Sequence, residues 1–159
     1  MELDATDLAI ISILQHEGRV TNAELADRVG LSPSACLRRV RSLENEDVID
    51  RYVALVNPAA VGRATSVFVE ISLASQTEAQ LDEFEAAIGE CPEVMSCHLM
   101  SGESDYLVHL ACADVGDYER IHRTRLAILP GVSRLRSSFA IRQVCDRTGF
   151  QLGPYRGPR

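Results

Sequence analysis

The sequence predicts an α+β fold, with a three-helix N-terminal part and a C-terminal part of order βαββαβ. Three observations support this: apolar residues recur at helical spacing up to about residue 45, β-rich runs begin near Thr65, and two helical segments separate those runs. The chain has 159 residues, of which 46% are hydrophobic and 25% charged. These are ordinary values for globular proteins, and the length suits one domain or two small ones.

Helix caps divide the N-terminal part. Residues 4–17 carry apolar side chains at three- and four-residue steps, and Gly18 ends this first helix. The segment Thr21-Asn22-Ala23-Glu24 has the spacing of a capping box for a short second helix, which Gly30 terminates. Ser32-Pro33 fits the N-cap and first position of a third helix, which we expect to run to about Asn45.

The remaining elements follow from β-rich runs and from breakers. Residues 48–49 and 52–56 are β-rich, and Asn57-Pro58 closes them with a turn. Further on we expect strands at 67–73, 94–100, 106–112 and 132–144, with helices at 78–88 and 117–129. This order is that of a ferredoxin-like domain. The expected boundaries are residues 1–50 for the first domain, 51–63 for a strand-forming linker, 64–148 for the second domain and 149–159 for a weakly ordered tail.

Composition excludes several classes of function. The formal net charge is −7 and every one of the 16 basic residues is Arg, so a catalytic lysine and a Walker-type phosphate loop are both excluded. The acidic total also disfavours a general nucleic-acid coat or an anionic-membrane binder. The sequence has no apolar run of about 18 residues and no positive N-terminal region, so we expect neither a membrane span nor a signal peptide. Five cysteines without a Cys-x-x-Cys pair indicate a reduced, cytoplasmic protein.

Residues 21–40 have the spacing of a helix-turn-helix. On a helical wheel, Cys36, Val40 and Leu43 fall on one side of the third helix. The opposite side offers hydroxyl and guanidinium groups, which suit the major groove: Arg binds guanine bidentately, and the helix N-terminus accepts a phosphate. The candidate DNA-binding residues are Thr21, Asn22, Ser32, Pro33, Ser34, Arg38, Arg39 and Arg41.

Local charge supports this interpretation. The window 30–43 holds three Arg and no acid, although the whole chain is acidic. A solvated face on an ordinary amphipathic helix is the alternative explanation. The small Ala26, the turn at Gly30 and the Ser32-Pro33 start favour a DNA-reading helix instead.

Several segments match the pattern of one known family. They are 3–4, 7, 13–14, 18–26, 29–34, 38–44, 92–94, 97–98, 101–107 and 129–132. On these residues the chain, from 2 to about 150, resembles the Lrp/AsnC family of feast/famine regulators. The resemblance implies a winged helix-turn-helix, a strand-forming linker, and a βαββαβ domain for ligand binding and oligomerisation. It further implies dimers formed through the sheets, often assembled to octamers, which bind amino acids between subunits.

Two positions depart from the family pattern. Asp47 stands where relatives usually have Gly, and a left-handed conformation there suits Asp less well than Gly. In the last strand Leu135 stands where relatives often have Thr near the effector, whereas Ser137 keeps the second hydroxyl.

The turn Gly102-Glu103-Ser104-Asp105 is the candidate effector site. Gly102 permits a close approach of the backbone or a positive φ, and its amide N–H suits a ligand carboxylate. Asp105 supplies a negative charge that complements the α-ammonium group of an amino acid. An ordinary hairpin turn is the alternative, since these residue types are common in turns. Met100 and Leu135 would supply an apolar wall, which favours a ligand with an aliphatic side chain. The candidate effector-binding residues are Met100, Gly102, Asp105, Leu135 and Ser137.

Other constellations are weaker. His98 and His109 would face each other across a hairpin with loop 102–105, but Cys97 would point to the other sheet face, so we expect no metal site. We expect no cofactor, and no catalytic grouping that would make the chain an enzyme. Five arginines of the second domain are expected to pair with acids of the first helix, with contact to wrapped DNA as the alternative: Arg120, Arg123, Arg125, Arg134 and Arg136.

The sequence is therefore interpreted as a sequence-specific transcription regulator whose assembly and DNA affinity respond to an amino acid. Its expected partners are double-stranded DNA, the amino acid, and further copies of itself as a dimer or higher oligomer. Two alternatives are a regulatory subunit that binds an amino acid and acts on an enzyme, and a nucleoid-architectural DNA binder. The arginine-bearing third helix argues against the first alternative, and the net charge of −7 against the second.

Overall fold

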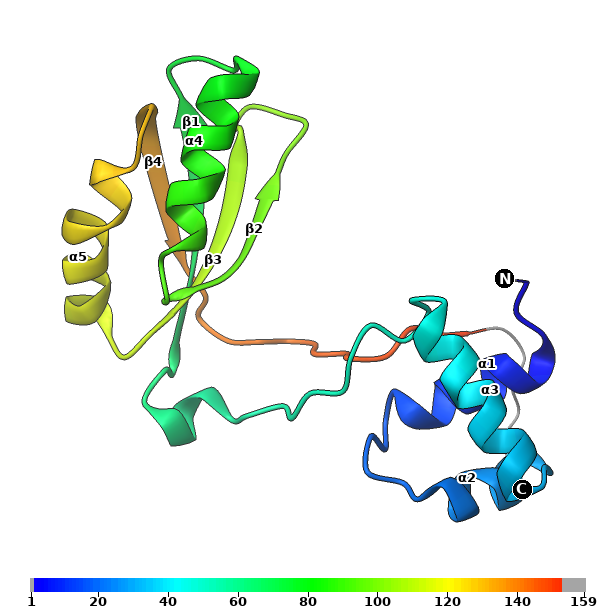
Figure 1. Cartoon of the computed structure of the whole chain (residues 1–159). Coiled ribbons are helices and arrows are strands. Elements are labelled where there is room, and N and C mark those ends of the chain that lie inside the picture. The colour runs from blue at the N-terminus through cyan, green and yellow to red at the C-terminus, as the bar shows by residue number, and fades with distance from the viewer. Residues whose placement is uncertain (1, 153–159) are drawn as a thin grey trace. The chain divides into compact units, whose positions relative to one another are not determined.

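The computed structural model describes residues 2–152, which divide into two compact units (Figure 1). One unit holds the chain up to Leu55 together with the segment from Val144 onward, and the other holds Val56–Gln143. Each unit has its own hydrophobic core. Within the described range no helix is long and apolar enough to cross a membrane. The rest of the predicted tail, 153–159, lies outside the described residues.

The first unit consists of helices α1 (Ala5–Leu14), α2 (Asn22–Val29) and α3 (Pro33–Asn45). Asp4, Thr21 and Ser32 cap the three N-termini with their side chains, because the first backbone N–H groups of a helix have no partner inside it. The predicted capping box of α2 is present between Thr21 and Glu24. Gly30 ends α2 with a φ of 69°, a left-handed conformation that glycine adopts without steric cost.

The core of this unit is built from one face of each helix. Ile10 from α1, Ala26 from α2, and Cys36 and Leu43 from α3 are completely buried. Val40 packs against them from the same side of α3. This face of α3 is therefore committed to the core, as the helical wheel predicts, and its opposite face stays on the surface.

The first part of the predicted tail docks on α1. The backbone N–H of Phe150 donates to Gln15 Oε1 at 2.7 Å, and Gln15 Nε2 donates to the Phe150 carbonyl at 3.3 Å. Gly149 lies so close that a Cβ there would be 3.2 Å from side-chain atoms of Gln15 and His16. These hydrogen bonds tie Phe150 to Gln15, the residue that ends α1, while the weak order expected for residues 149–159 stays a prediction.

The second unit has the predicted βαββαβ order. Its elements are a 3₁₀ turn η1 (Pro58–Val61), β1 (Thr65–Leu73), α4 (Glu78–Gly89), β2 (Val94–Leu99), β3 (Tyr106–Cys112), α5 (Val115–Thr124), a 3₁₀ turn η2 (Leu126–Ile128) and β4 (Val132–Phe139). The strands form one antiparallel sheet in the order β2-β3-β1-β4. The last strand ends at Phe139, earlier than the predicted residue 144.

Alternation along the strands places α4 and α5 on one face of the sheet (Figure 1). In β3, every second side chain from Tyr106 to Cys112 is buried against these helices. The Tyr106 ring packs on Phe84 of α4 with centroids 4.4 Å apart, and its hydroxyl donates to Glu85 at 2.8 Å. Burial is the main cause that raises the pKa of Tyr106, so its phenol stays protonated.

The other face of the sheet is more polar. His109 stacks on Phe68 at a centroid distance of 4.7 Å, and its Nε2 lies 2.5 Å from Ser66 Oγ. Burial lowers the pKa of His109, which favours the neutral ring in this position. Beside this pair, Arg136 forms an ion pair with Glu70 at 2.5 Å.

The β2–β3 register corrects the expected histidine pair. His98 lies opposite Leu107, and His109 lies opposite Ser96, after a register shift between Val94 and Ser96. The hairpin closes with the N–H of Met100 donating to the Asp105 carbonyl at 2.8 Å. The prediction that the two histidines face each other is therefore wrong. Among the described residues no group of three or more His, Cys, Asp or Glu side chains is placed to hold a metal.

The linker forms no strand with any described part of the chain. Residues 52–56, expected to be a strand, carry exposed apolar side chains on Val53, Leu55 and Val56. The hydroxyl of Tyr52 donates to Glu44 of α3 at 3.0 Å, and burial together with Glu44 raises the pKa of Tyr52 to about 12. A strand-forming linker thus remains a prediction that needs a partner strand from another chain.

The turn after α3 contains a strained residue. Asp47 has a φ of 54° and is the one non-glycine residue of the described chain with a positive φ. This confirms the expected left-handed conformation at Asp47. The N–H groups of Val48 and Ile49 both donate to the Leu43 carbonyl, so the turn holds the end of α3.

Replacing Asp47 tests this strain. Asp47→Gly should raise the free energy of unfolding by about 0.5 kcal/mol, because relief of the left-handed strain exceeds the entropy that glycine loses on folding. Asp47→Ala should lower it by about 1 kcal/mol, because Ala lacks the local hydrogen bonding that makes this conformation tolerable for Asp. Urea denaturation followed by circular dichroism measures both. Equal stabilities of the two variants would contradict the assignment.

Candidate DNA-reading face and effector site

The outward face of α3 forms a shallow groove with a volume of about 420 Å³. In the described part of the chain, neither Arg38 nor Arg41 forms an ion pair or a hydrogen bond, so both guanidinium groups are available to a ligand. Five donors on each planar group suit phosphate or guanine. The groove-lining residues are Ser34, Leu37, Arg38, Arg41, Ser42 and Asn45.

Three of these residues, Leu37, Ser42 and Asn45, were absent from the sequence-based candidates. Asn45 is four residues after Arg41, and Leu37 four residues before it, so helical spacing alone places both beside that arginine. Leu37 was missed because apolar side chains in an amphipathic helix are assigned to its buried face. The structure leaves it 39% exposed.

Arg39 differs from its two neighbours. Its Nη1 atom lies 2.8 Å from Asp4 Oδ2 and 2.8 Å from Asp7 Oδ1. The backbone N–H of Asp7, followed by the Arg39 guanidinium, lowers the pKa of Asp4, so the acid stays ionised. Asp7 is buried, and Arg39 therefore joins the N-terminus of α1 to α3. The geometry supports a role for Arg39 in holding α3 in place rather than in contacting DNA.

The remaining candidates near the two helix starts serve as caps. Thr21 Oγ1 donates to Glu24 Oε2 at 2.7 Å, and Ser32 Oγ accepts the Ala35 N–H at 3.3 Å. Asn22 Nδ2 donates to the carbonyl of Pro33 at 2.9 Å, which joins the start of α2 to the start of α3. These contacts fix both N-termini, where partial positive charge attracts phosphate.

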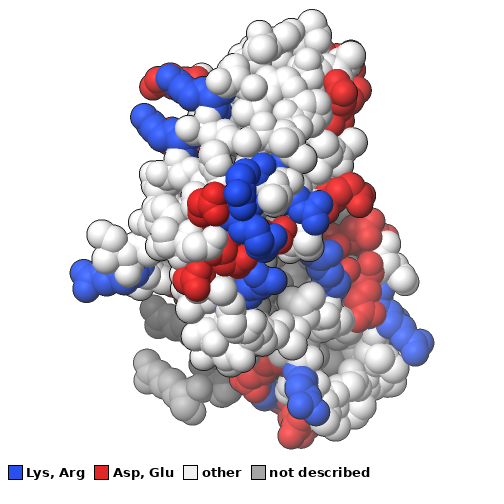
Figure 2. All heavy atoms as spheres, turned by 90° about the vertical axis from the view of Figure 1, so that its left-hand side faces the viewer, with Lys and Arg blue, Asp and Glu red and all other residues white. Residues whose placement is uncertain are grey.

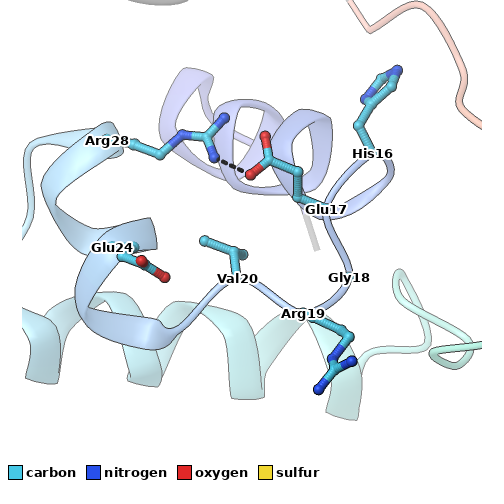
Figure 3. A pocket seen from close by; sticks show the side chains of 7 residues that line it. All are labelled: His16, Glu17, Gly18, Arg19, Val20, Glu24 and Arg28. Atoms are coloured by element: carbon cyan, nitrogen blue, oxygen red, sulfur yellow. Dashed lines mark hydrogen bonds and ion pairs between the residues drawn. The ribbon is translucent and has the colours of Figure 1, made fainter.

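A larger cavity of about 590 Å³ lies between the end of α1 and α2 (Figure 3). Glu17 and Arg28 point toward each other and form an ion pair at 2.7 Å. The side chains of His16 and Arg19 point in opposite directions, away from this pair. Because Glu24 is committed to the capping box, the cavity offers no uncommitted charged group that points inward, and it is a poor candidate for an anion site.

In the second unit, Asp105 is held at the end of β1. Its Oδ2 atom accepts the Leu73 N–H at 2.6 Å, and its Oδ1 atom accepts from Gln76 Nε2 at 2.6 Å. The backbone N–H of Asp105 donates to the Ile71 carbonyl. A carboxylate accepts about four hydrogen bonds, so this one retains capacity for an ammonium group.

The other effector candidates lie around the same sheet. Leu135 lies opposite Ile71 in the β1–β4 register and packs against the core, so Asp105 and Leu135 flank β1 at the same end. Ser137 lies two pairs further along, opposite Val69, and its hydroxyl bonds to that of Tyr118. Met100 is exposed.

Gly102 has open space around it, since a Cβ there would meet nothing within 4 Å. The expected positive φ is absent, because the described glycines with a positive φ are Gly30, Gly62 and Gly131. Its value for a ligand therefore depends on an accessible backbone amide and not on an unusual conformation.

The arginines of the second unit are mostly paired. Arg120 contacts Asp117 at 2.7 Å and Glu93 at 3.3 Å, and Arg123 contacts Glu119. Arg134 pairs with Glu103, and Arg136 with Glu70. The expected partners on the first helix are therefore wrong. Pairing itself is confirmed for these four arginines, whereas Arg125 forms no ion pair with a described residue. Figure 2 shows blue and red side chains side by side on the face that carries α5, rather than one basic patch.

Comparison with known proteins identifies both units. The Lrp/AsnC ligand-binding domain matches residues 66–150, and a winged helix-turn-helix DNA-binding domain matches residues 3–50. The leucine-responsive regulatory protein of Haemophilus influenzae is 41% identical over 148 residues, which cover 93% of this chain and 89% of that protein. The Bkd operon transcriptional regulator of Pseudomonas aeruginosa is 40% identical, with coverage of 95% and 99%.

A solved structure agrees with these matches. The transcriptional regulator NMB0573 of Neisseria meningitidis, determined as a complex with L-Met, superposes with a TM-score of 0.91 at 35% sequence identity. The alignment covers 96% of this chain and 98% of that one.

Substitution of the adjacent arginines separates structural from ligand-facing roles. Arg39→Ala should lower the thermal unfolding midpoint, because it leaves the buried Asp7 without its cation. Arg38→Ala is the matched control, since it removes the same charge one position earlier and breaks no ion pair with a described residue. Thermal denaturation followed by circular dichroism compares them. Equal midpoints would show that Arg39 does not hold α1 and α3 together.

Proposed function

Because this chain belongs to the Lrp/AsnC family of transcriptional regulators, we propose that α3 reads operator DNA in the major groove and that an amino acid bound by the second unit controls this reading. The observation that carries the proposal is that the guanidinium groups of Arg38 and Arg41, on the outward face of α3, have no ion-pair or hydrogen-bond partner among the described residues. In this proposal the chain regulates transcription and is not an enzyme. It acts in the cytoplasm, where its DNA is, and it needs no cofactor or metal.

The DNA-reading role follows from the surface of α3. Its buried side chains hold α3 in the core of the first unit, while Ser34, Arg38 and Arg41 project from the opposite side. Arg binds guanine O6 and N7 bidentately, and each such contact discriminates by about 1–3 kcal/mol against the wrong base. The capped start of α3 at Ser32 supplies backbone N–H groups to a phosphate. Thr21, Asn22, Pro33 and Arg39 then contribute by positioning these groups.

The proposed assembly follows from the small number of DNA contacts that the first unit of one subunit offers. Because α3 offers two arginines without a partner among residues 2–152, one subunit neutralises few phosphates and gains little affinity for DNA. We propose a homodimer that reads two half-sites about one helical turn apart, and an octamer built from such dimers. The exposed residues 52–56 need a partner strand, which a second copy supplies.

The effector site lies at the sheet end beside Asp105. We propose that the amide of Gly102 binds the amino-acid carboxylate, that Asp105 binds its ammonium group, and that Met100 and Leu135 line the side-chain pocket. Ser137 of a neighbouring subunit closes the site, because a hairpin alone is too open to exclude water. The L-Met complex of the Neisseria protein supports an amino acid with an unbranched apolar side chain as the first ligand to test.

Arginine substitutions on α3 test DNA reading. Arg38→Ala and Arg41→Ala should each weaken binding to a selected operator by about 1–3 kcal/mol, because each removes a base or phosphate contact. Arg123→Ala on α5 is the control, since it removes the same charge from an ion pair in the other unit. Fluorescence anisotropy at fixed salt measures all three. Unchanged affinity in an Arg38→Ala/Arg41→Ala double variant that folds would overturn the assignment.

The effector site is tested at Asp105. Asp105→Asn keeps an oxygen to accept the Leu73 N–H but removes the charge, so L-methionine binding should weaken at least tenfold. Glu103→Gln is the control, because it removes a charge from the same loop, where Glu103 pairs with Arg134. Isothermal calorimetry measures both, and DNA binding without ligand should stay near that of the parent. An Asp105→Asn variant with undiminished affinity would place the ammonium group elsewhere.

A further inference from the structure

Leu37 is an apolar side chain on a face of α3 that is otherwise polar. It is 39% exposed, and it shares its groove with Ser34, Arg38, Arg41, Ser42 and Asn45. The hydrophobic core of this unit takes Cys36, Val40 and Leu43 from α3 and does not include Leu37. The core therefore does not account for a leucine at this position.

The neighbours of Leu37 define what can cover it. Arg41 is one helical turn further along, so the two side chains lie on the same face about 5–6 Å apart at Cβ. An Arg41 side chain engaged with a base brings Leu37 to the base edges as well. The apolar feature that the major groove presents there is the C5-methyl group of thymine, because the other recognition points are hydrogen-bond donors and acceptors.

We propose that Leu37 is a specificity-determining residue, which contacts the C5-methyl group of one thymine in each half-site. This inference rests on the proposed DNA-reading function of α3. One helical turn rises 5.4 Å, and successive base pairs are about 3.4 Å apart. The thymine therefore lies within about two base pairs of the base that Arg41 reads.

Replacement of thymine by deoxyuridine tests the inference, because it removes the methyl group and leaves all hydrogen-bonding groups in place. A duplex selected from random DNA by the full-length protein is resynthesised with each thymine replaced in turn. For the parent protein, one position per half-site should lose about fourfold in affinity, as expected for about one buried methyl-sized group. The other thymines should tolerate the replacement.

The Leu37→Ala variant completes the cycle. It should bind the thymine and deoxyuridine duplexes with equal affinity at that position, because the methyl group has lost its partner. Leu99→Ala is the matched control: it truncates an exposed leucine of β2 in the other unit and should keep the fourfold difference. Circular dichroism establishes that both variants fold.

Three results would overturn the inference, and they differ in what else they imply. If no replacement weakens binding by the parent protein, or if Leu37→Ala keeps the full difference, Leu37 does not read a methyl group. DNA reading by α3 then still stands wherever Arg38→Ala and Arg41→Ala weaken binding. If the selected duplex binds no better than random DNA, the proposed function fails together with the inference.

Discussion

The first unit depends on how α3 divides its surface between the core and the solvent. Cys36 and Leu43 are completely buried, and Val40 packs beside them, so the helix is anchored along one side. Arg39 adds a polar anchor on the flank through Asp4 and Asp7. Because these contacts already fix α3 in the first unit, Arg38 and Arg41 keep their positions on the helix without an ion pair to any described residue. A DNA-reading helix needs both an anchored face and guanidinium groups that are free to bind DNA. A guanidinium in an internal ion pair is not available to DNA, and a helix that the core does not hold cannot present its side chains at fixed positions.

Much of this arrangement was predictable because its causes are local. Thr21 with Glu24, and Ser32 with Ala35, mark helix starts through hydrogen bonds that span three residues. The βαββαβ order was equally visible, since β-rich runs, helical runs and turn residues follow one another along residues 67–144. The left-handed Asp47 was expected from the family resemblance, which implies Gly at this position. The residues that read DNA and bind the effector are still proposals, but the helix that would carry the first set was placed correctly.

What escaped prediction depends on contacts between residues distant in the sequence. Arg39 looks like its neighbours in a helical wheel, and only folding brings Asp4 and Asp7 beside it. The β2–β3 hairpin closes at Met100 and Asp105, which places His98 opposite Leu107 and not opposite His109, and a two-residue period does not reveal where a hairpin closes. Residues 52–56 fit a strand, but a strand needs a partner, and pattern alone does not reveal whether the same chain provides one.

The same logic connects the proposed effector site to the fold. Asp105 stabilises the end of β1 through Leu73 and Gln76, so a ligand that binds its carboxylate acts on a group that already has a structural role. On the other side of β1, Leu135 packs into the core and Ser137 is held by Tyr118. A ligand that pulls on Asp105 therefore acts on β1 at its junction with β4. In the proposed mechanism, the ligand shifts the protein between two assembly states that differ in DNA affinity. The change in DNA-binding free energy cannot exceed the difference between the ligand's binding free energies for these two states. Regulation then requires that these contacts differ between those states, and the hydrogen bonds of Asp105 are the ones that a bound ammonium group would alter first.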